Sequence, residues 1–316
     1  MKKTVKQILI LVLVVMIFAA FNASIYALVT QRCGINFDTR IIEPERYLPF
    51  DANAGYTKVE SDFELDGDIP VIDGAAALVP VYSSIVDSVY PQESVKYDSV
   101  TKNYTQDSAI RFTDTIKAYK GVTDGDIDII LCAAPSEQQK QYAKDQGVEL
   151  VYVPIGYEAF VFFVNENNPV DDLTVSQIKD IYAGEITNWA EVGGADRSIN
   201  PLDRPEGSGS QTVMLKFMGD REIKKNPFGI FGGAIGFSFR FYVEGVVANG
   251  GIKLLSVNGI EPTEENIRNG SYPIIYQFYA VYRKDNQNEN VQKLVDFMLS
   301  EDGQKIIDEN GYTPIK

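Results

Sequence analysis

Histidine is absent from all 316 residues of this chain. A Ser/His/Asp or Cys/His nucleophile is therefore excluded, and so is a zinc site with imidazole ligands. Cysteine is scarce as well, because Cys33 and Cys132 are the only two. Their spacing fits neither a disulfide framework nor a CxxC metal or redox motif, and Cys132 in "DIDIILCAAP" is typical of a small buried residue. No metal and no cofactor are therefore expected, and any catalysis would have to use residues other than these.

Basic residues are in deficit, with 29 Lys and Arg against 44 Asp and Glu and a formal net charge of -15. The resulting field repels nucleic acid and anionic membrane surfaces, so neither is expected as the main partner. Apolar residues are plentiful at 45% of the chain. A chain of this length and composition can bury the cores of two globular units.

Charged residues are also missing from one long run, "QILILVLVVMIFAAFNASIYALVTQ", between residues 7 and 31. At roughly 1.5 Å per helical residue, its apolar part can cross a hydrocarbon core of about 30 Å. Three lysines precede the run and Arg32 follows it, which predicts a cytoplasmic N-terminus and an extracytoplasmic remainder. We interpret residues 1–32 as a membrane anchor. Cleavage of a signal peptide, giving a secreted chain, is the alternative, although "NASIYA" lacks a clean A-x-A site.

Residues 33–68 are mixed and acidic, with turn signals but no sustained period, which predicts an extracytoplasmic tether. Lipidation of Cys33 within it is not expected, because Arg32 stands where lipoproteins carry a small residue. From residue 69 onward, short β-branched runs such as "IPVID", "IDIILC", "EAFVFFVN" and "GAIGFSFRFYV" alternate with amphipathic helical stretches. This alternation predicts an α/β architecture with helices covering a sheet.

Three strand-to-helix loops follow from this pattern. "GAAAL" precedes a helix with Pro80 in its first turn, and "AAPSEQQ" contains Ser136 and Gln139 at capping-box spacing. Thr174 and Gln177 form another such box. The third loop is "RPEGSGSQT", which precedes the apolar spacing of a further helix.

The third loop is suited to hold an anion. Free N–H groups in a helix's first turn and the positive end of its dipole attract negative charge, and glycines allow close approach. Gly207 and Gly209 give that access. Ser208 and Ser210 can donate from hydroxyls, and Arg204 offers a planar fork of N–H groups. These donors predict a site for a small tetrahedral oxyanion.

Glu206 would repel an anion unless that anion carries a proton to donate, which favours phosphate over sulfate. Structural roles remain open for the same residues: Ser210 as a helix cap, and Arg204 as the partner of Asp203 at the surface. The GK[ST] triplet of P-loops and the G-x-S-x-G motif are both missing from the sequence, so a hydrolase with Ser208 as nucleophile is not favoured.

The stretch "RPEGSGSQTVMLKF" resembles the R-x-[DE]-G-S-G-[ST] signature of phosphate-binding proteins, the solute receptors of bacterial ABC phosphate importers in the type II periplasmic-binding-protein superfamily. Similar stretches follow the family's order, among them "VIDGAAALVPVYSSIVDSVYP", "DGDIDIILCAAPSEQQ" and "FMLSEDGQKIIDENGYTPI". The resemblance covers roughly residues 69–316.

The resemblance implies an α/β fold of two lobes with a ligand cleft between them, preceded here by an N-terminal transmembrane helix. Residues 69–155 and 246–316 would form lobe 1, and residues 156–245 would form lobe 2. It also implies that Arg204, Ser208, Gly209 and Ser210 bind the oxyanion, with Glu206 in the place of an acidic proton acceptor. The backbone of Ala77 and Leu78 would line the other lobe.

The sequence departs from the family pattern in both loops of that other lobe. Residues 75–78 read "AAAL", where the family has threonine or serine, and Ala133 stands near a position where many phosphate receptors carry aspartate. The family's serine before "GDIDII" has Thr113 or Thr115 as its substitute, and an N-cap is the competing role for either threonine.

We therefore predict a monomeric, membrane-tethered, extracytoplasmic solute-binding protein. It would capture inorganic phosphate or a related oxyanion, close its lobes by hinge motion, and present the anion to ABC permease subunits. The alternative is a membrane-tethered sensor or cell-surface interaction module of the same fold that has lost phosphate binding.

Overall fold

The computed structural model describes residue 16 and residues 44–224, 232–247 and 251–315 of the chain. The α-helices are α2 (Val79–Val89), α3 (Thr115–Asp124), α4 (Glu137–Asp145), α5 (Val175–Tyr182), α6 (Gly209–Met218), α7 (Arg240–Val247), α8 (Glu264–Arg268), α9 (Glu289–Met298) and α10 (Glu301–Glu309). Short 3-10 helices are η1 (Pro44–Tyr47), η2 (Ala76–Leu78), η3 (Gln92–Ser94) and η4 (Trp189–Val192).

The principal strands are β1 (Ile72–Gly74), β4 (Ile129–Ala133), β5 (Leu150–Asn165), β7 (Ile199–Pro201), β8 (Gly233–Phe239), β9 (Ile252–Leu254), β11 (Ile275–Arg283) and β12 (Thr313–Pro314). They form one sheet in the order β1-β4-β11-β5-β8-β7, with β9 and β12 also paired to β5. Two small two-stranded sheets pair β6 (Asp172–Leu173) with β10 (Ser256–Val257), and β2 (Tyr97–Asp98) with β3 (Asn103–Tyr104).

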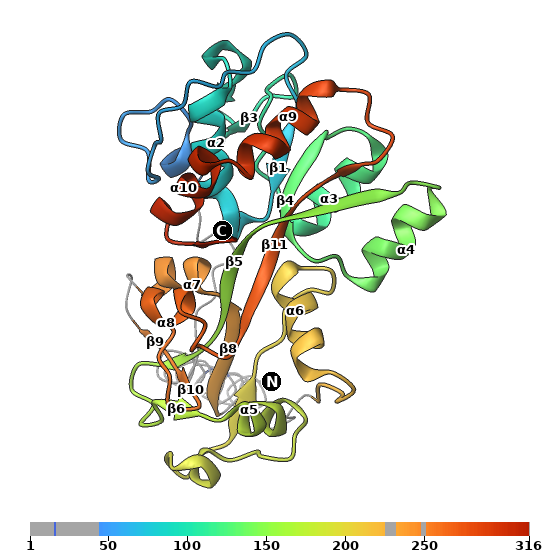
Figure 1. Cartoon of the computed structure of the whole chain (residues 1–316). Coiled ribbons are helices and arrows are strands. Elements are labelled where there is room, and N and C mark those ends of the chain that lie inside the picture. The colour runs from blue at the N-terminus through green and yellow to red at the C-terminus, as the bar shows by residue number, and fades with distance from the viewer. Residues whose placement is uncertain (1–15, 17–43, 225–231, 248–250, 316) are drawn as a thin grey trace, which may run out of the picture.

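Strand β5 connects the two halves of the molecule. Its 16 residues pair with β11 from Leu150 to Ala159 and with β8 from Phe160 to Val164. Figure 1 shows β5 and β11 running side by side from the upper part of the molecule into the lower part. The mixed strand order follows from this crossing, because parallel β1–β4 and β7–β8 pairs lie at opposite ends of an antiparallel centre.

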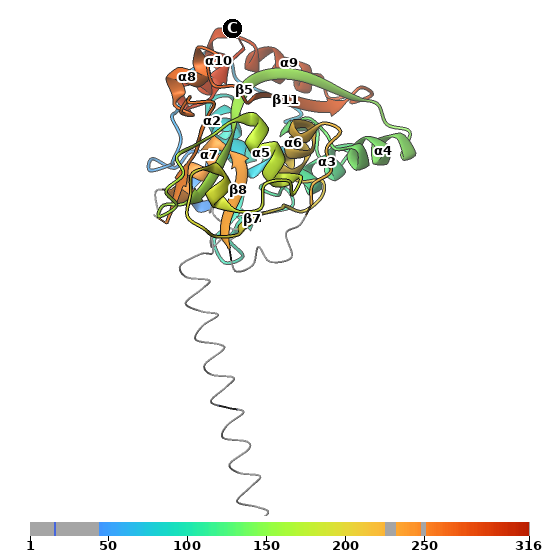
Figure 2. The ribbon, with the colours of Figure 1, turned by 90° about the horizontal axis from the view of Figure 1, so that it is seen from below.

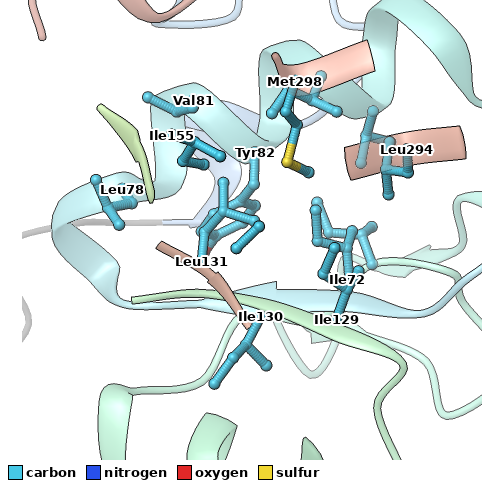
Figure 3. Packing of buried hydrophobic residues seen from close by; sticks show 14 of the residues in the cluster. Ile72, Leu78, Val81, Tyr82, Ile129, Ile130, Leu131, Ile155, Leu294 and Met298 are labelled. Atoms are coloured by element: carbon cyan, nitrogen blue, oxygen red, sulfur yellow. The ribbon is translucent and has the colours of Figure 1, made fainter. Parts of the chain in front are cut away.

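Two hydrophobic cores lie along this sheet. The first lobe, defined by the first core, contains Ile72 of β1, Leu131 of β4 and Val81 of α2, and Leu294 and Met298 of α9 pack against them (Figure 3). The second lobe, defined by the second core, is built on the aromatic run of β5, with α5, α6 and α7 around it. Helices α6 and α7 lie on opposite sides of β8 (Figures 1 and 2). The predicted two-lobed α/β fold is thus present.

The local signals read from the sequence are confirmed at several helix starts. Pro80 lies in the first turn of α2, and complete capping boxes open α4 at Ser136 and α5 at Thr174. Helix α6 begins directly after Ser208. "GAIGFSFRFYV" was predicted as one strand, but β8 ends at Phe239 and α7 follows it.

The structure differs from the predicted segment boundaries at two places. From residue 44 the predicted tether packs on the first core, where Tyr47, Val59 and Leu65 are buried because contact with the core removes their apolar surface from water. The second core also includes side chains from Ile252 to Ile274, which had been assigned to lobe 1. The chain therefore returns to the first lobe along β11, and not near residue 246.

Among the residues that the structure describes, no helix combines the length and apolarity needed to cross a bilayer. The predicted anchor over residues 1–32 lies outside the described residues apart from Met16, and so does Cys33. Cys132 is a buried free thiol, as predicted.

Candidate functional site

The first turn of α6 is built from the loop singled out in the sequence. The Ser208 hydroxyl accepts a hydrogen bond from the Gln211 N–H at 3.3 Å and so acts as the N-cap. Gly207, just before it, has a φ of 82°, a left-handed conformation that glycine adopts without strain. The Ser210 hydroxyl lies 3.1 Å from the Ser238 hydroxyl of β8, and both serines are buried.

Arg204 is fixed to the same turn by its backbone. Its N–H donates to the Gln211 Oε1 at 2.9 Å, so the backbone of the arginine is held at the start of α6. Its guanidinium lies over the ring of Tyr242 on α7, 5.3 Å from the ring centroid, which is a cation–π geometry. Arg204 is half-buried, with its backbone fixed at the start of α6 while its guanidinium packs on the Tyr242 ring of α7.

The opposite lobe approaches this turn closely. A Cβ added to Gly209 would lie 3.3 Å from the Thr115 hydroxyl and 3.8 Å from the Cβ of Ala133. The Gln139 side-chain amide donates to the Gly207 carbonyl at 2.9 Å. The starts of α3 and α4 therefore meet the start of α6 across the boundary between the lobes, and Figure 1 shows α6 below α3.

The first loop contributes small apolar groups. Ala77, in η2, is buried and belongs to the second core together with Ala133, so both alanines lie at the junction of the lobes. The Tyr312 hydroxyl donates to the Ala77 carbonyl. The Leu78 N–H donates to the Ala75 carbonyl at 2.8 Å, so this amide is already engaged within the loop.

The two candidate threonines have different surroundings. Thr113 donates its hydroxyl to the Asp73 carboxylate at 2.5 Å, and its N–H donates to the same group at 3.1 Å. Thr115 is buried at the first position of α3 and faces Gly209. The structure therefore brings Thr115 to the turn that holds Ser208 and Ser210, whereas Thr113 is engaged by Asp73.

Glu206 lies at the protein surface, two positions before the N-cap of α6. It is exposed, and it borders a depression of about 270 Å³ together with Lys120 and Tyr142 of the first lobe. The role of Glu206 as a proton acceptor stays a prediction.

Several residues of the site escaped the sequence reasoning. Ser238 and Tyr242 follow no turn signal, and Asp73 lies inside an apolar strand, where a lone carboxylate was the available clue. Gln139 was recognised as a capping residue, but its second hydrogen bond depends on tertiary contact.

The chemistry of the site suits an oxyanion, because it combines a guanidinium, hydroxyls and helix N-termini. Among the described residues, no cluster of His, Cys, Asp or Glu is arranged to hold a metal ion.

A family model described as a PBP superfamily domain matches residues 80–302. The chain is 30% identical over 166 residues to the phosphate-binding protein PstS of Bacillus subtilis, covering 48% of this chain and 53% of that protein. It is 27% identical over 180 residues to PstS of Borreliella burgdorferi, covering 51% and 64%. The matches thus span between about half and two thirds of these relatives.

Solved structures agree on the fold. A Clostridium perfringens protein assigned as a phosphate ABC transporter substrate-binding protein, solved with bound phosphate, is 28% identical with a TM-score of 0.55. That match covers 78% of this chain and 98% of the other. An ABC-type phosphate transport receptor from Vibrio cholerae has a TM-score of 0.52 at 20% identity, covering 77% and 98%.

Proposed function

Since the chain belongs to the PBP superfamily, we propose that it is an extracytoplasmic solute-binding protein that captures inorganic phosphate for an ABC importer. The observation that carries the proposal is the start of α6. There the Arg204 backbone is bonded to the helix turn that is capped by Ser208 and contains Ser210, and Thr115 of the opposite lobe faces this turn. A helix N-terminus with an adjacent guanidinium is a favourable environment for a doubly charged anion.

The names of relatives support the choice of anion. The B. subtilis and B. burgdorferi relatives are phosphate-binding proteins, and the C. perfringens structure contains phosphate. The site has the donor-rich character such an anion needs. Binding between two lobes that share β5 and β11 would be accompanied by closure of the lobes about these strands.

Calorimetric titration of the full chain in mild detergent with phosphate tests the proposal. Arg204→Ala should weaken phosphate binding by roughly 10- to 100-fold, since hydrogen bonds to charged groups contribute about 1.5–3 kcal/mol. Arg268→Ala is the matched control, because it removes the same charge from an exposed ion pair with Asp308 on the surface. Its affinity should stay within about twofold of the parent.

Saturable phosphate binding that survives Arg204→Ala unchanged would contradict the proposed site. Sulfate in a parallel titration examines the role of Glu206: if this carboxylate discriminates, Glu206→Gln should narrow the difference in affinity between the two anions.

We also propose that residues 1–32 anchor the domain on the outer face of the cell membrane, beside its permease. Membrane fractionation of the full chain and of a chain lacking residues 1–32 checks the anchor.

A sensor or interaction module is the second candidate. It is favoured by one observation, the absence of side-chain donors at Ala77 and Ala133, which follow β1 and end β4 and pack as apolar groups at the junction of the lobes. Absence of binding heat with phosphate, sulfate and other oxyanions would favour this candidate over the receptor.

A further inference from the structure

Asp73 is a carboxylate placed where apolar residues are expected. It is the central residue of β1, it pairs with Ile130 of β4, and its side chain has 0% exposure. Aspartate is almost never fully buried unless it has partners. β1 leads directly into the loop that contains Ala77, so the group lies behind one wall of the candidate site.

The partners of Asp73 come from the segment before α3. Its Oδ1 accepts from the Gly74 N–H at 2.8 Å and from the Thr113 N–H at 3.1 Å, and its Oδ2 accepts from the Thr113 hydroxyl at 2.5 Å. The same segment runs beside β1 through backbone bonds that end at Arg111, whose N–H donates to the Ile72 carbonyl. After Arg111, the segment is bonded to β1 through the Asp73 side chain, which accepts from Thr113.

The attachment controls the start of α3. Thr113 is followed by Asp114, the N-cap, whose side chain accepts from the Lys117 N–H at 2.9 Å. Thr115 is the first residue of the helix, and its hydroxyl faces Gly209 of the opposite lobe. Only Asp114 separates the residue that Asp73 contacts from the group that faces the candidate oxyanion site.

We propose that Asp73 is a positioning residue of the oxyanion site: its ionised carboxylate holds Thr113 and thereby sets Thr115 against the first turn of α6. This inference rests on the proposed function. It adds a residue that does not touch the anion and yet makes its capture dependent on pH.

The charge state of Asp73 changes within an accessible range. Burial raises the pKa of Asp73 to about 6, and the hydrogen bonds from Thr113 and Gly74 oppose that shift. The other ionisable groups that influence it or are influenced by it are Arg111 and Asp114 beside it, Tyr82 from α2 and Cys132 from β4. Asp114 raises the pKa of Asp73 further, whereas burial keeps the pKa values of Tyr82 and Cys132 well above their ordinary values. Asp73 is therefore the buried group here that titrates near neutrality.

Asp73→Asn tests the proposal by phosphate titration of the full chain at about pH 8 and about pH 5. At the higher pH the variant should bind on the order of tenfold more weakly, because an amide cannot accept on both of its terminal atoms. At the lower pH the parent carboxyl is itself largely neutral, so the gap should narrow to about threefold or less. Phosphate's own ionisation cancels in the ratio of the two proteins at each pH.

A second pair of variants separates positioning from general damage. Thr113→Val removes the hydroxyl that Asp73 holds and should match Asp73→Asn at about pH 8, whereas Thr113→Ser keeps the hydroxyl and should retain most of the parent affinity. The double variant Asp73→Asn, Thr113→Val should lose no more than either single one, because the two act through one contact.

Amide hydrogen exchange without ligand gives a readout that does not need phosphate binding. Asp73→Asn should raise exchange at residues 114–118 at about pH 8, with residues 137–141 at the start of α4 unchanged as the control. If the parent binds no phosphate, the proposed function fails. A constant affinity ratio at both pH values, or unchanged exchange at residues 114–118, overturns the inference about Asp73 itself.

Discussion

Gly209 lies where the first turn of α6 meets the opposite lobe, and its missing side chain is what permits the approach. The space that a Cβ would fill there is bordered by the Thr115 hydroxyl, Phe239 and Ala133. Its backbone lies in the allowed helical region, so the glycine is needed for access and not for an unusual φ. At Gly207, in contrast, glycine is needed for the backbone conformation, because its φ of 82° is left-handed.

Replacement of Gly209 by alanine therefore should weaken phosphate capture more than it affects folding. The added Cβ would stand 3.3 Å from the Thr115 hydroxyl, so closure of the lobes must displace one of them. We expect roughly a tenfold loss of affinity, larger for Gly209→Val, with a free energy of unfolding within about 1 kcal/mol of the parent because alanine favours a helix. Calorimetry and urea denaturation measure the two effects. Parent-like affinity in both variants would show that the lobes bind the anion without this contact.

At the scale of elements, features that depend on neighbouring residues could be predicted from the sequence, whereas contacts between distant segments could not. The capping boxes at Ser136 and Thr174 could be read from the sequence because both partners lie within one helix turn. The α6 start was equally readable. The partners of Arg204 and Thr113 could not be, because Tyr242 and Asp73 come from distant segments and neither carries a local pattern. The fold, supported by many periodic segments, was easier to predict than the site.

Helix α4 links a local signal to a tertiary contact through one side chain. The Gln139 Oε1 accepts from the Ser136 N–H at 2.8 Å within the capping box, while its Nε2 donates to the Gly207 carbonyl of the other lobe at 2.9 Å. One amide thus serves both the start of the helix and the contact between the lobes.

Gln139→Glu separates these two tasks. A glutamate keeps the capping box, since its carboxylate can accept from the Ser136 N–H, but it cannot donate to the Gly207 carbonyl and repels it. We expect phosphate to dissociate about tenfold faster in stopped-flow measurements, with helix content unchanged. Gln138→Glu is the control, because it adds the same charge at the neighbouring exposed position of α4, which borders the same depression. Equal rates in the two variants would mean that charge, and not the lost donor, is responsible.

At the scale of the whole molecule, the two lobes share a buried charged cluster where β5 crosses between them. Glu158 of β5 is 4% exposed, and Arg240 at the start of α7 is also buried. Arg240 donates to the Gly311 carbonyl at 2.8 Å beside β12, and it forms ion pairs with Glu244 and Glu264. The cluster therefore connects the second lobe to the C-terminal strand that pairs with the crossing.

Burial raises the pKa of Glu158 from 4.5 to about 8, although Arg240 opposes the shift. The folded chain consequently binds more protons than the unfolded chain between these two values, so this group's contribution to stability is lost as pH rises through that window. Asp73 acts in the same direction, but because its folded pKa is about 6, its contribution to stability is lost at lower pH than that of Glu158. The range from about pH 6 to about pH 8 is thus where Glu158 should govern the slope.

Glu158→Gln should flatten the fall in melting temperature between about pH 6 and about pH 8, because a neutral amide imitates the protonated acid and has no proton to lose. The difference from the parent should grow towards about pH 8 and reach on the order of a few kcal/mol in the free energy of unfolding. Glu264→Gln, which alters an exposed partner of the same arginine, should shift stability by at most about 1 kcal/mol and leave the slope in place. Thermal unfolding followed by circular dichroism across this range decides the matter. A parent slope that persists in Glu158→Gln would mean that the carboxylate is already ionised where the strands cross, held so by Arg240.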